Sequence, residues 1–208
     1  MKARYVLGAL AFVALVALGW YFLYPTTAAT SIRNDLSSGT DIIAFGDSLV
    51  WGEGADEGKN FVSLLSQRTG QPIVNLGNPG DTTAEALARV SQLDKYNPKV
   101  VILLIGGNDY LKRVPSDETF ANLGKLIENI QSRDAIVLLL GIRGGVVIDH
   151  FALRFEKLRD TYHTAYVSDV LGGIFGNHEF MSDEVHPNNA GYAKIADRIY
   201  PVLAQLLK

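Results

Sequence analysis

The chain has 208 residues, of which 48% are hydrophobic and 20% charged, and this is enough for one well-buried domain. Its formal net charge is −3, and no basic patch indicates a nucleic-acid partner. The absence of cysteine excludes disulfides, thiolate zinc sites and a cysteine nucleophile.

The N-terminal segment predicts a membrane anchor. Residues 5–24 carry no charge, and Lys2 and Arg4 precede them. At about 1.5 Å per residue, this run spans roughly 30 Å as a helix, the thickness of a hydrocarbon core. We therefore expect residues 1–25 to form a transmembrane helix with a cytoplasmic N-terminus, and the rest to lie on the periplasmic or extracellular side. The alternative is a signal peptide cleaved near the small residues 27–29, which gives a secreted protein.

The remainder predicts a short tether followed by one α/β domain. Residues 26–39 are mostly small and polar and are typical of a tether, which leaves residues 40–208 for the domain. Short apolar runs predict strands at 41–45, 72–76, 99–105, 135–140 and 164–167. Apolar residues at helical spacing lie between them, over 61–68, 87–93, 120–130, 151–162 and 192–206. Thr82 and Glu85 form a possible capping box.

The strand pattern predicts a parallel sheet covered on both faces. Residues 100–105 are apolar without interruption, which indicates burial on both sides of the sheet. We therefore expect a three-layer α/β/α sandwich with about five parallel strands in the order 2-1-3-4-5. Sites in such sheets lie beyond the carboxyl ends of the strands. Ser48, Gly80 and Asn108 follow the predicted ends of the first three strands.

A serine nucleophile requires a base and an acid that orients it. Asp183 and His186 are three residues apart, so one short turn can place the carboxylate beside the imidazole and leave the other ring nitrogen for Ser48. Pro187 then suits the first turn of the last helix. The alternative is that Asp183 only caps that helix and His186 is a surface residue. The other histidines lack an equally placed acid and are expected at the surface or in loops: His150, His163 and His178.

Attack by a serine on an acyl carbon produces an oxyanion, which requires hydrogen-bond donors fixed in advance. Gly80 can present its backbone N–H, Asn108 can present its side-chain amide, and the Ser48 N–H is a third candidate. The alternatives are an ordinary turn glycine at Gly80 and a tight loop over residues 106–109. Neither a P-loop nor a G-x-G-x-x-G spacing occurs at the first strand–helix junction.

Four sequence blocks together resemble the SGNH (GDSL) hydrolase family, in its bacterial thioesterase, lysophospholipase and arylesterase branch. The blocks are Gly46-Asp47-Ser48-Leu49, Pro79-Gly80-Asp81-Thr82, Gly106-Gly107-Asn108-Asp109 and Asp183-x-x-His186-Pro187-Asn188. The resemblance covers the chain from about residue 41 onward. It implies a flavodoxin-like fold, Ser48 as nucleophile with Asp183 and His186, and an oxyanion hole of Ser48, Gly80 and Asn108. It implies no metal and no organic cofactor.

Two segments concern the substrate. Relatives in that branch usually carry Pro, Asn and Tyr in the loop after strand 4, whereas this chain has Ile-Arg-Gly-Gly-Val-Val-Ile at 142–148. The acyl group that relatives accept therefore cannot be transferred to this chain. Residues 171–176 are glycine-rich and apolar, and form either a wall of the acyl site or a plain surface loop.

These observations predict a serine esterase or thioesterase that forms an acyl-enzyme. The expected partners are the membrane, through the N-terminal helix, and a small acyl-ester or lipid substrate: a lysophospholipid, an aryl ester or a short-to-medium acyl ester. Three alternatives stay open, because the same catalytic residues would serve two of them and would be unused in the third. They are a cell-envelope glycan O-acetyl esterase, an O-acyltransferase and an inactive membrane-tethered binding module.

Overall fold

The computed structural model describes residues 31–143 and 150–208. The predicted membrane anchor at 1–25 and most of the predicted tether lie outside the described residues, as does most of the loop after the fourth strand. Within the described ranges, no helix is long and apolar enough to span a bilayer. Residues from Ser31 to Lys208 belong to one compact unit.

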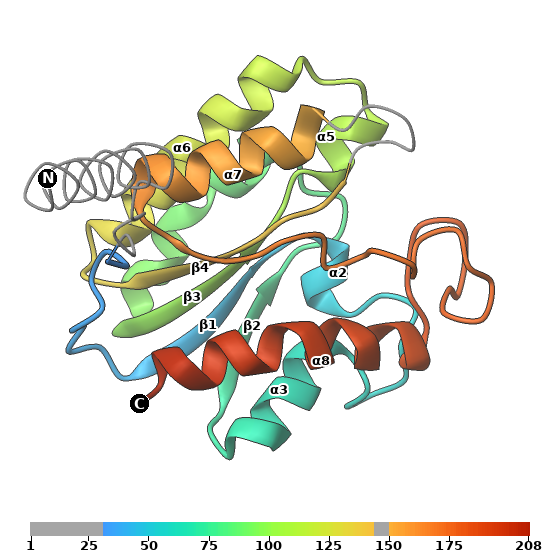
Figure 1. Ribbon diagram of the computed structural model, residues 1–208, viewed down its shortest axis with the longest axis horizontal. Coiled ribbons are helices and arrows are strands. Elements are labelled where there is room, and N and C mark those ends of the chain that lie inside the picture. The colour runs from blue at the N-terminus through green and yellow to red at the C-terminus, as the bar shows by residue number, and fades with distance from the viewer. Residues whose placement is uncertain (1–30, 144–149) are drawn as a thin grey trace, which may run out of the picture. The chain divides into compact units, whose positions relative to one another are not determined.

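The described residues form a five-stranded parallel sheet in the order β2-β1-β3-β4-β5, as predicted (Figure 1). The strands are β1 (Asp41–Gly46), β2 (Ile73–Gly77), β3 (Pro98–Leu104), β4 (Ile136–Leu140) and β5 (Ala165–Val167). Each begins and ends within one residue of its predicted bounds. The continuous apolar run in β3 reflects the predicted burial on both faces of the sheet, because residues 100–104 are at most 1% exposed.

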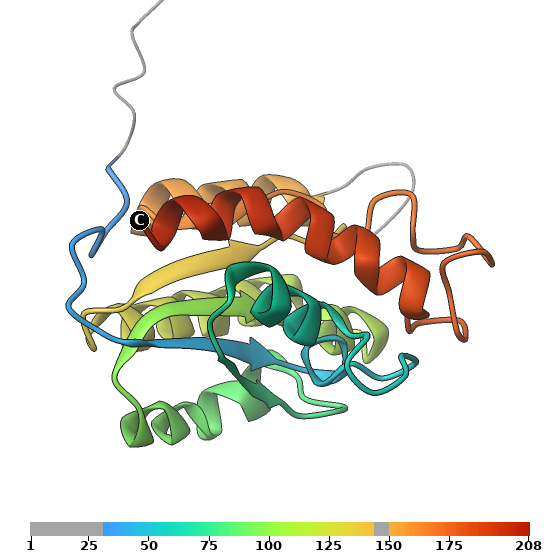
Figure 2. The same ribbon diagram turned by 90° about the horizontal axis from the view of Figure 1, so that it is seen from below.

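Helices cover both faces of the sheet. Helices α6 (Ser116–Gln131) and α7 (His150–Tyr162) lie on one face, and α3 (Phe61–Thr69) and α8 (Asn189–Leu206) lie on the other. Figure 2, seen from below, shows α3 beside α8, and the two helices pack together. The result is the predicted three-layer α/β/α sandwich.

The short helices differ from the prediction. The single helix expected over 87–93 is divided into α4 (Thr83–Ala88) and a 3₁₀ helix, η1 (Val90–Lys95), with Arg89 between them. The capping box of Thr82 and Glu85 that begins α4 is confirmed. Helices α2 (Ser48–Trp51) and α5 (Gly107–Leu111) were not predicted, because one turn is too short to show an apolar period.

Glycines at the carboxyl ends of two strands allow α2 to pack close to the sheet. A Cβ atom at Gly46 would collide with the Leu104 carbonyl, and one at Gly77 would collide with the Trp51 backbone. The turn after β1 is therefore pressed against both neighbouring strands. This places Ser48, the first residue of α2, at the centre of the carboxyl edge of the sheet.

Candidate active site

Ser48 lies at the start of a helix that is only one turn long. Asp47 is the N-cap residue, and its side chain accepts a hydrogen bond of 3.0 Å from the Leu49 N–H. Gly52, in the left-handed conformation, ends the helix. Ser48 is 8% exposed, so its hydroxyl sits in a fixed and nearly enclosed position.

His186 contacts both Ser48 and Asp183. Its Nε2 lies 3.1 Å from Ser48 Oγ, and its Nδ1 lies 2.8 Å from Asp183 Oδ2. The other carboxylate oxygen of Asp183 accepts hydrogen bonds from the Val185 and His186 N–H groups, at 2.8 and 2.7 Å. Asp183 therefore shapes a tight turn, and the alternative that it caps the last helix is wrong, because Asn188 caps α8.

The last helix also begins later than expected. Pro187 was predicted in its first turn, but α8 begins at Asn189 after its cap residue, Asn188. The Asn188 side chain accepts from the Ala190 and Gly191 N–H groups. This cap satisfies two N–H groups of the first turn, so Pro187 remains in the turn that carries His186.

The contact with Asp183 selects the ring tautomer of His186 that serves a base. Hydrogen bonds from the His186 ring and from two backbone N–H groups lower the pKa of Asp183 from 3.8 to about 2. An ionised carboxylate only accepts hydrogen bonds, so Nδ1 of His186 carries the hydrogen and Nε2 is left to accept from Ser48. His163 and His178 are exposed, as predicted, and His150 is the first residue of α7.

Glu53 is a contact of His186 that sequence reasoning missed. Its Oε2 lies 3.6 Å from His186 Nε2, on the side of the ring that faces Ser48. The Tyr192 hydroxyl, buried in α8, donates to the Glu53 carbonyl at 2.8 Å and holds this loop in place. Gly54 packs against the His186 segment, where a Cβ atom would meet the Pro187 carbonyl at 2.6 Å. No sequence pattern marks Glu53, because it approaches His186 from a loop more than a hundred residues away.

Each of the three candidate oxyanion donors has an N–H hydrogen that could bind a substrate oxygen. Asn108 Nδ2 donates one hydrogen bond of 2.9 Å to the Asp81 carbonyl, and its second hydrogen stays available. Within the part of the chain that the structure describes, neither the Ser48 N–H nor the Gly80 N–H has a hydrogen-bond acceptor. Gly80 is exposed, with a positive φ of 85°.

The second and third sequence blocks are joined directly. The buried carboxylate of Asp109 accepts hydrogen bonds from the Thr83 N–H, at 2.8 Å, and from the Thr83 hydroxyl. The alternative of a tight loop over 106–109 is only partly correct, because Gly107 to Asp109 form the first turn of α5. This helix places Asn108 beside the loop that carries Gly80.

Asp47 is a buried acid beside the nucleophile. It is 3% exposed, and burial raises its pKa from 3.8 to about 7. The Leu49 N–H and the charge of His186 oppose that shift, and the charge of Asp81 adds to it. The raised pKa means that Asp47 binds a proton more tightly in the folded protein than in the unfolded chain.

This raised pKa predicts a pH-dependent stability. As pH rises from about 4 to about 7, the unfolded chain loses this proton and the folded protein keeps it, so the free energy of unfolding falls. At about 1.4 kcal/mol per pH unit, the gap between 3.8 and about 7 corresponds to about 4 kcal/mol. Asp47→Asn keeps the acceptor for the Leu49 N–H and is expected to remove this fall in the free energy of unfolding. Urea unfolding of both proteins at pH 4 and pH 8 measures it, and equal pH slopes would contradict the burial argument.

A cavity of about 500 Å³ opens beside Ser48. Ser48, Asn108 and His186 line it, whereas Gly80 does not. Most of the remaining lining is apolar, and three of these side chains are more than half exposed at the protein surface: Tyr110, Leu111 and Phe175. The cavity therefore offers an apolar environment next to a hydrogen-bonded serine.

Both segments that concern the substrate reach this cavity. Leu171 and Phe175 lie in its wall, so residues 171–176 form a wall of the site and not a plain surface loop. Arg198 of α8 anchors this wall by donating to the Val170 carbonyl at 2.7 Å and to the Gly172 carbonyl. Ile142 and Arg143, at the start of the loop after β4, also line the cavity.

Residues 44–194 match the GDSL-like Lipase/Acylhydrolase family. The chain belongs to this family. It is therefore an SGNH/GDSL hydrolase that acts on ester bonds, as the four sequence blocks predicted.

Several relatives are enzymes of this kind. The chain is 30% identical over 178 residues to Esterase TesA of Pseudomonas aeruginosa, covering 80% of this chain and 89% of the relative. It has the same identity over 178 residues with an Arylesterase of Vibrio mimicus, again covering 80% and 89%. The Thioesterase 1/protease 1/lysophospholipase L1 of Escherichia coli is 26% identical over 165 residues, covering 75% and 79%.

Solved structures of the family share the fold. The crystal structure of TesA superimposes with a TM-score of 0.76 at 29% identity, covering 80% of this chain and 99% of that one. The esterase AlinE4 of the SGNH-hydrolase family gives a TM-score of 0.63 at 29% identity, covering 82% and 98%. The likeness extends over nearly the whole length of both neighbours.

Proposed function

We propose that the protein hydrolyses carboxylic esters or thioesters through an acyl-enzyme on Ser48. The observation that carries this proposal is the hydrogen-bonded series from Ser48 to His186 to Asp183, set in the wall of an apolar cavity. The serine has a base within 3.1 Å, and the base has an ionised carboxylate on its far side. This is what activation of a serine hydroxyl requires.

The reaction has two steps. Ser48 Oγ adds to the acyl carbon while its proton passes to His186 Nε2, and the same proton then goes to the departing alcohol or thiol. A water molecule next attacks the acyl-enzyme, His186 accepts its proton, and the acid leaves as Ser48 recovers the hydrogen. Asp183 holds the ring and stabilises its positive charge in both steps. Glu53, at 3.6 Å, adds a second negative charge near the protonated ring.

The oxyanion formed in each step is assigned to three N–H groups: those of Ser48, Gly80 and the Asn108 side chain. Each has a hydrogen without an acceptor among the described residues, so it costs no existing hydrogen bond to bind the substrate oxygen. Donors fixed before the reaction stabilise the transition state more than the bound ester.

Asn108→Ala is expected to lower kcat about 10²- to 10³-fold with little change in KM, since the negative charge that Asn108 stabilises develops after substrate binding. Steady-state kinetics on a chromogenic ester measures both constants. Because Asn108 also donates to the Asp81 carbonyl, the melting temperature of the variant serves as the folding control. A variant that folds and keeps its kcat would remove Asn108 from the oxyanion hole.

The cavity favours an apolar acyl group. Leu111, Leu171 and Phe175 would contact a hydrocarbon chain, whereas Arg143 and Asp169 are the charged side chains of the lining away from Ser48. A series of p-nitrophenyl esters of increasing chain length tests this: activity should rise from acetate to a medium chain. Hydrolysis confined to acetate esters would instead favour the glycan O-acetyl esterase. Transfer of the acyl group to an added lysolipid or glycan hydroxyl, detected by product analysis, would favour the acyltransferase.

We also propose that residues 1–25 anchor this domain, residues 40–208, on the outer side of a membrane. The support is the uncharged run at 5–24 with its positive flank. The described chain starts at the edge of the sheet opposite Ser48, where the Asn34 side chain donates to the Gln131 and Ala135 carbonyls. Protease accessibility in intact cells, with the N-terminal mass of the purified chain, tests the side and the anchor. Loss of the first 25 to 30 residues would show a cleaved signal peptide.

A further inference from the structure

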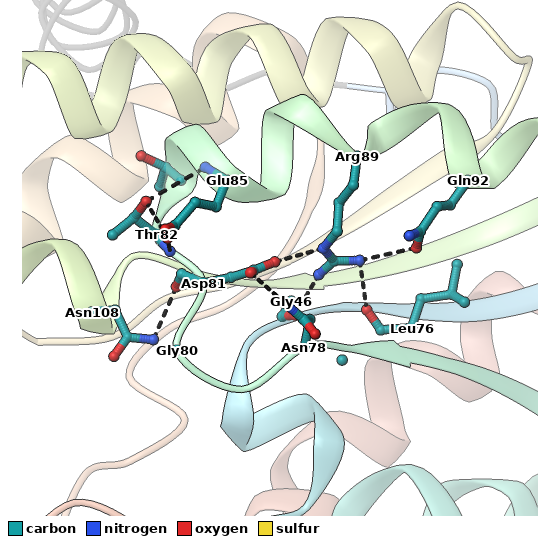
Figure 3. Close-up of polar contacts among 12 residues, drawn as sticks. Gly46, Leu76, Asn78, Gly80, Asp81, Thr82, Glu85, Arg89, Gln92 and Asn108 are labelled. Atoms are coloured by element: carbon teal, nitrogen blue, oxygen red, sulfur yellow. Dashed lines mark hydrogen bonds and ion pairs between the residues drawn. The ribbon is translucent and has the colours of Figure 1, made fainter.

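Arg89 joins the ends of two strands to the loop that carries Gly80. Its Nη2 donates to the Gly46 carbonyl at 2.8 Å, and its Nη1 donates to the Leu76 carbonyl at 3.1 Å. Its Nε donates to the Asp81 carboxylate at 2.5 Å. Figure 3 shows the guanidinium between these acceptors. The side chains of Arg89 and Asp81 are 15% and 6% exposed, so solvent screens this ion pair little.

Arg89 lies at the break between two helices. Arg89 ends α4 and precedes η1, and its side chain extends away from the helix toward Gly46 and Leu76 (Figure 3). The guanidinium lies over the Phe45 ring, 4.3 Å from the ring centre, and Nη1 also donates to the Gln92 side chain. The guanidinium is planar and has five N–H donors, so it can donate to acceptors that lie in several directions. A lysine ammonium is a compact charge and cannot reproduce this arrangement.

Asp81 connects Arg89 to two of the proposed oxyanion donors. It directly follows Gly80 in the chain, and its backbone carbonyl accepts the hydrogen bond from Asn108 Nδ2 at 2.9 Å. Its carboxylate also accepts from the Asn78 side chain at 2.5 Å, which closes the loop from 78 to 81. Gly80 is exposed and has no side chain, and its carbonyl accepts a hydrogen bond of 2.9 Å from the exposed Lys112 ammonium. Asp81 therefore contacts both donors directly, through the chain to Gly80 and through its carbonyl to Asn108.

Gly46 connects Arg89 to the third donor. It is the last residue of β1, two residues before Ser48, and its carbonyl also accepts from the Asn78 N–H at 2.9 Å. One guanidinium thus contacts the strand that leads into Ser48 and the loop that presents Gly80. Within the described chain, Arg89 does not line the cavity, so its effect on the reaction is indirect.

We propose that Arg89 is a positioning residue that sets the spacing of the oxyanion donors through Asp81 and Gly46. The proposal rests on the proposed function of Ser48, Gly80 and Asn108. An oxyanion hole acts only when its donors sit at hydrogen-bond distance from the developing charge, and a displacement of about 1 Å can cost about 10²-fold in rate. Arg89 contacts three separate segments, the ends of β1 and β2 and the loop of Asp81, and so sets their relative position.

The test compares Arg89→Gln with the wild-type protein on a p-nitrophenyl ester. Fluorophosphonate titration first counts the reactive sites, so that kcat is expressed per reactive serine and misfolded protein does not enter the result. We expect kcat to fall about 10- to 100-fold and KM to change less than about threefold. The affinity for an arylboronic acid, which adds to a serine as a tetrahedral anion, should fall by a similar factor. The midpoint of the pH–rate profile should not move, because the contacts of His186 are intact.

Two variants serve as controls. Arg133→Gln removes an ion pair whose arginine is about as exposed as Arg89, at 19%, while its partner Asp94, which it contacts at 2.6 Å, is 61% exposed. It should lower the melting temperature and leave kcat and boronic acid affinity unchanged. Arg89→Lys keeps a positive charge beside Asp81 but loses the several N–H donors of the guanidinium. Its kcat should therefore lie between those of the wild type and Arg89→Gln.

Asn108→Ala, measured in parallel, separates this proposal from the proposed function. If Asn108→Ala lowers kcat but Arg89→Gln lowers only the melting temperature, Arg89 is merely structural and the positioning proposal is overturned, while the oxyanion assignment stands. If Asn108→Ala itself keeps its kcat, the oxyanion assignment fails and the proposal fails with it. The double variant should lose less than the product of the two single losses, because both changes disturb the same donor.

Discussion

Ser48→Ala is expected to lower kcat about 10⁶-fold on any ester that the wild-type protein hydrolyses. Alanine removes the only atom that can form the acyl-enzyme, and the base then has no proton to accept from a nucleophile. The residual rate, from the donors and the cavity alone, should still exceed that of the uncatalysed reaction by about 10³- to 10⁴-fold. Steady-state hydrolysis of a p-nitrophenyl ester, with product followed over hours for the variant, measures the loss relative to the wild type and the excess over the uncatalysed rate.

Ser91→Ala is the matched control for this loss. Ser91 is exposed on η1, so the same change in chemistry there should leave kcat unchanged. Because the Ser48 side chain hydrogen-bonds only to His186 among the described residues, the alanine variant should fold normally. A folded Ser48→Ala protein that keeps more than about 1% of the activity would rule out Ser48 as nucleophile.

Asp183→Asn is expected to lower kcat about 10⁴-fold. The asparagine oxygen can still accept from the Val185 and His186 N–H groups, so the turn is expected to survive. The amide nitrogen, however, would donate to Nδ1 of His186 and leave the hydrogen on Nε2, where it blocks acceptance of the Ser48 proton. The loss should appear in kcat far more than in KM, since the cavity is unchanged.

Glu184→Gln is the control for Asp183→Asn, because it removes the charge of the adjacent, exposed acid. It should keep wild-type kcat. The pKa of Asp183, lowered to about 2, also predicts that this carboxylate stays ionised and that its role persists down to strongly acidic pH. If Asp183→Asn retains most of its activity, then Asp183 does not orient the base, and Glu53 becomes the acid to test next.

The sheet and the residues around Ser48 were predictable because their signals are local. Each strand is a continuous apolar run, and a parallel sheet with alternating helices brings the carboxyl ends of β1, β2 and β3 to one edge. Ser48, Gly80 and Asn108 directly follow those ends, so topology alone placed them near one another. Asp183 and His186 lie in one short turn, so their contact also required no long-range information.

The residues that support the site were not predictable in the same way. Glu53 reaches His186 from a loop held by Tyr192, and Asp47 acquires its raised pKa from burial that only the complete fold provides. Arg89 lies in what the sequence suggested was the interior of a helix. Its side chain finds acceptors on three segments, and only the packed structure defines where backbone carbonyls such as that of Leu76 point.

Peptide mapping after reaction with a fluorophosphonate tests the central claim most directly. This reagent phosphonylates a serine that a neighbouring base activates, and mass spectrometry then identifies the modified residue. The account predicts one adduct per chain, on the peptide that contains Ser48, with activity lost in proportion to labelling and no adduct in Ser48→Ala. An active protein that is not labelled, or one that is inactivated by labelling at another residue, would contradict it.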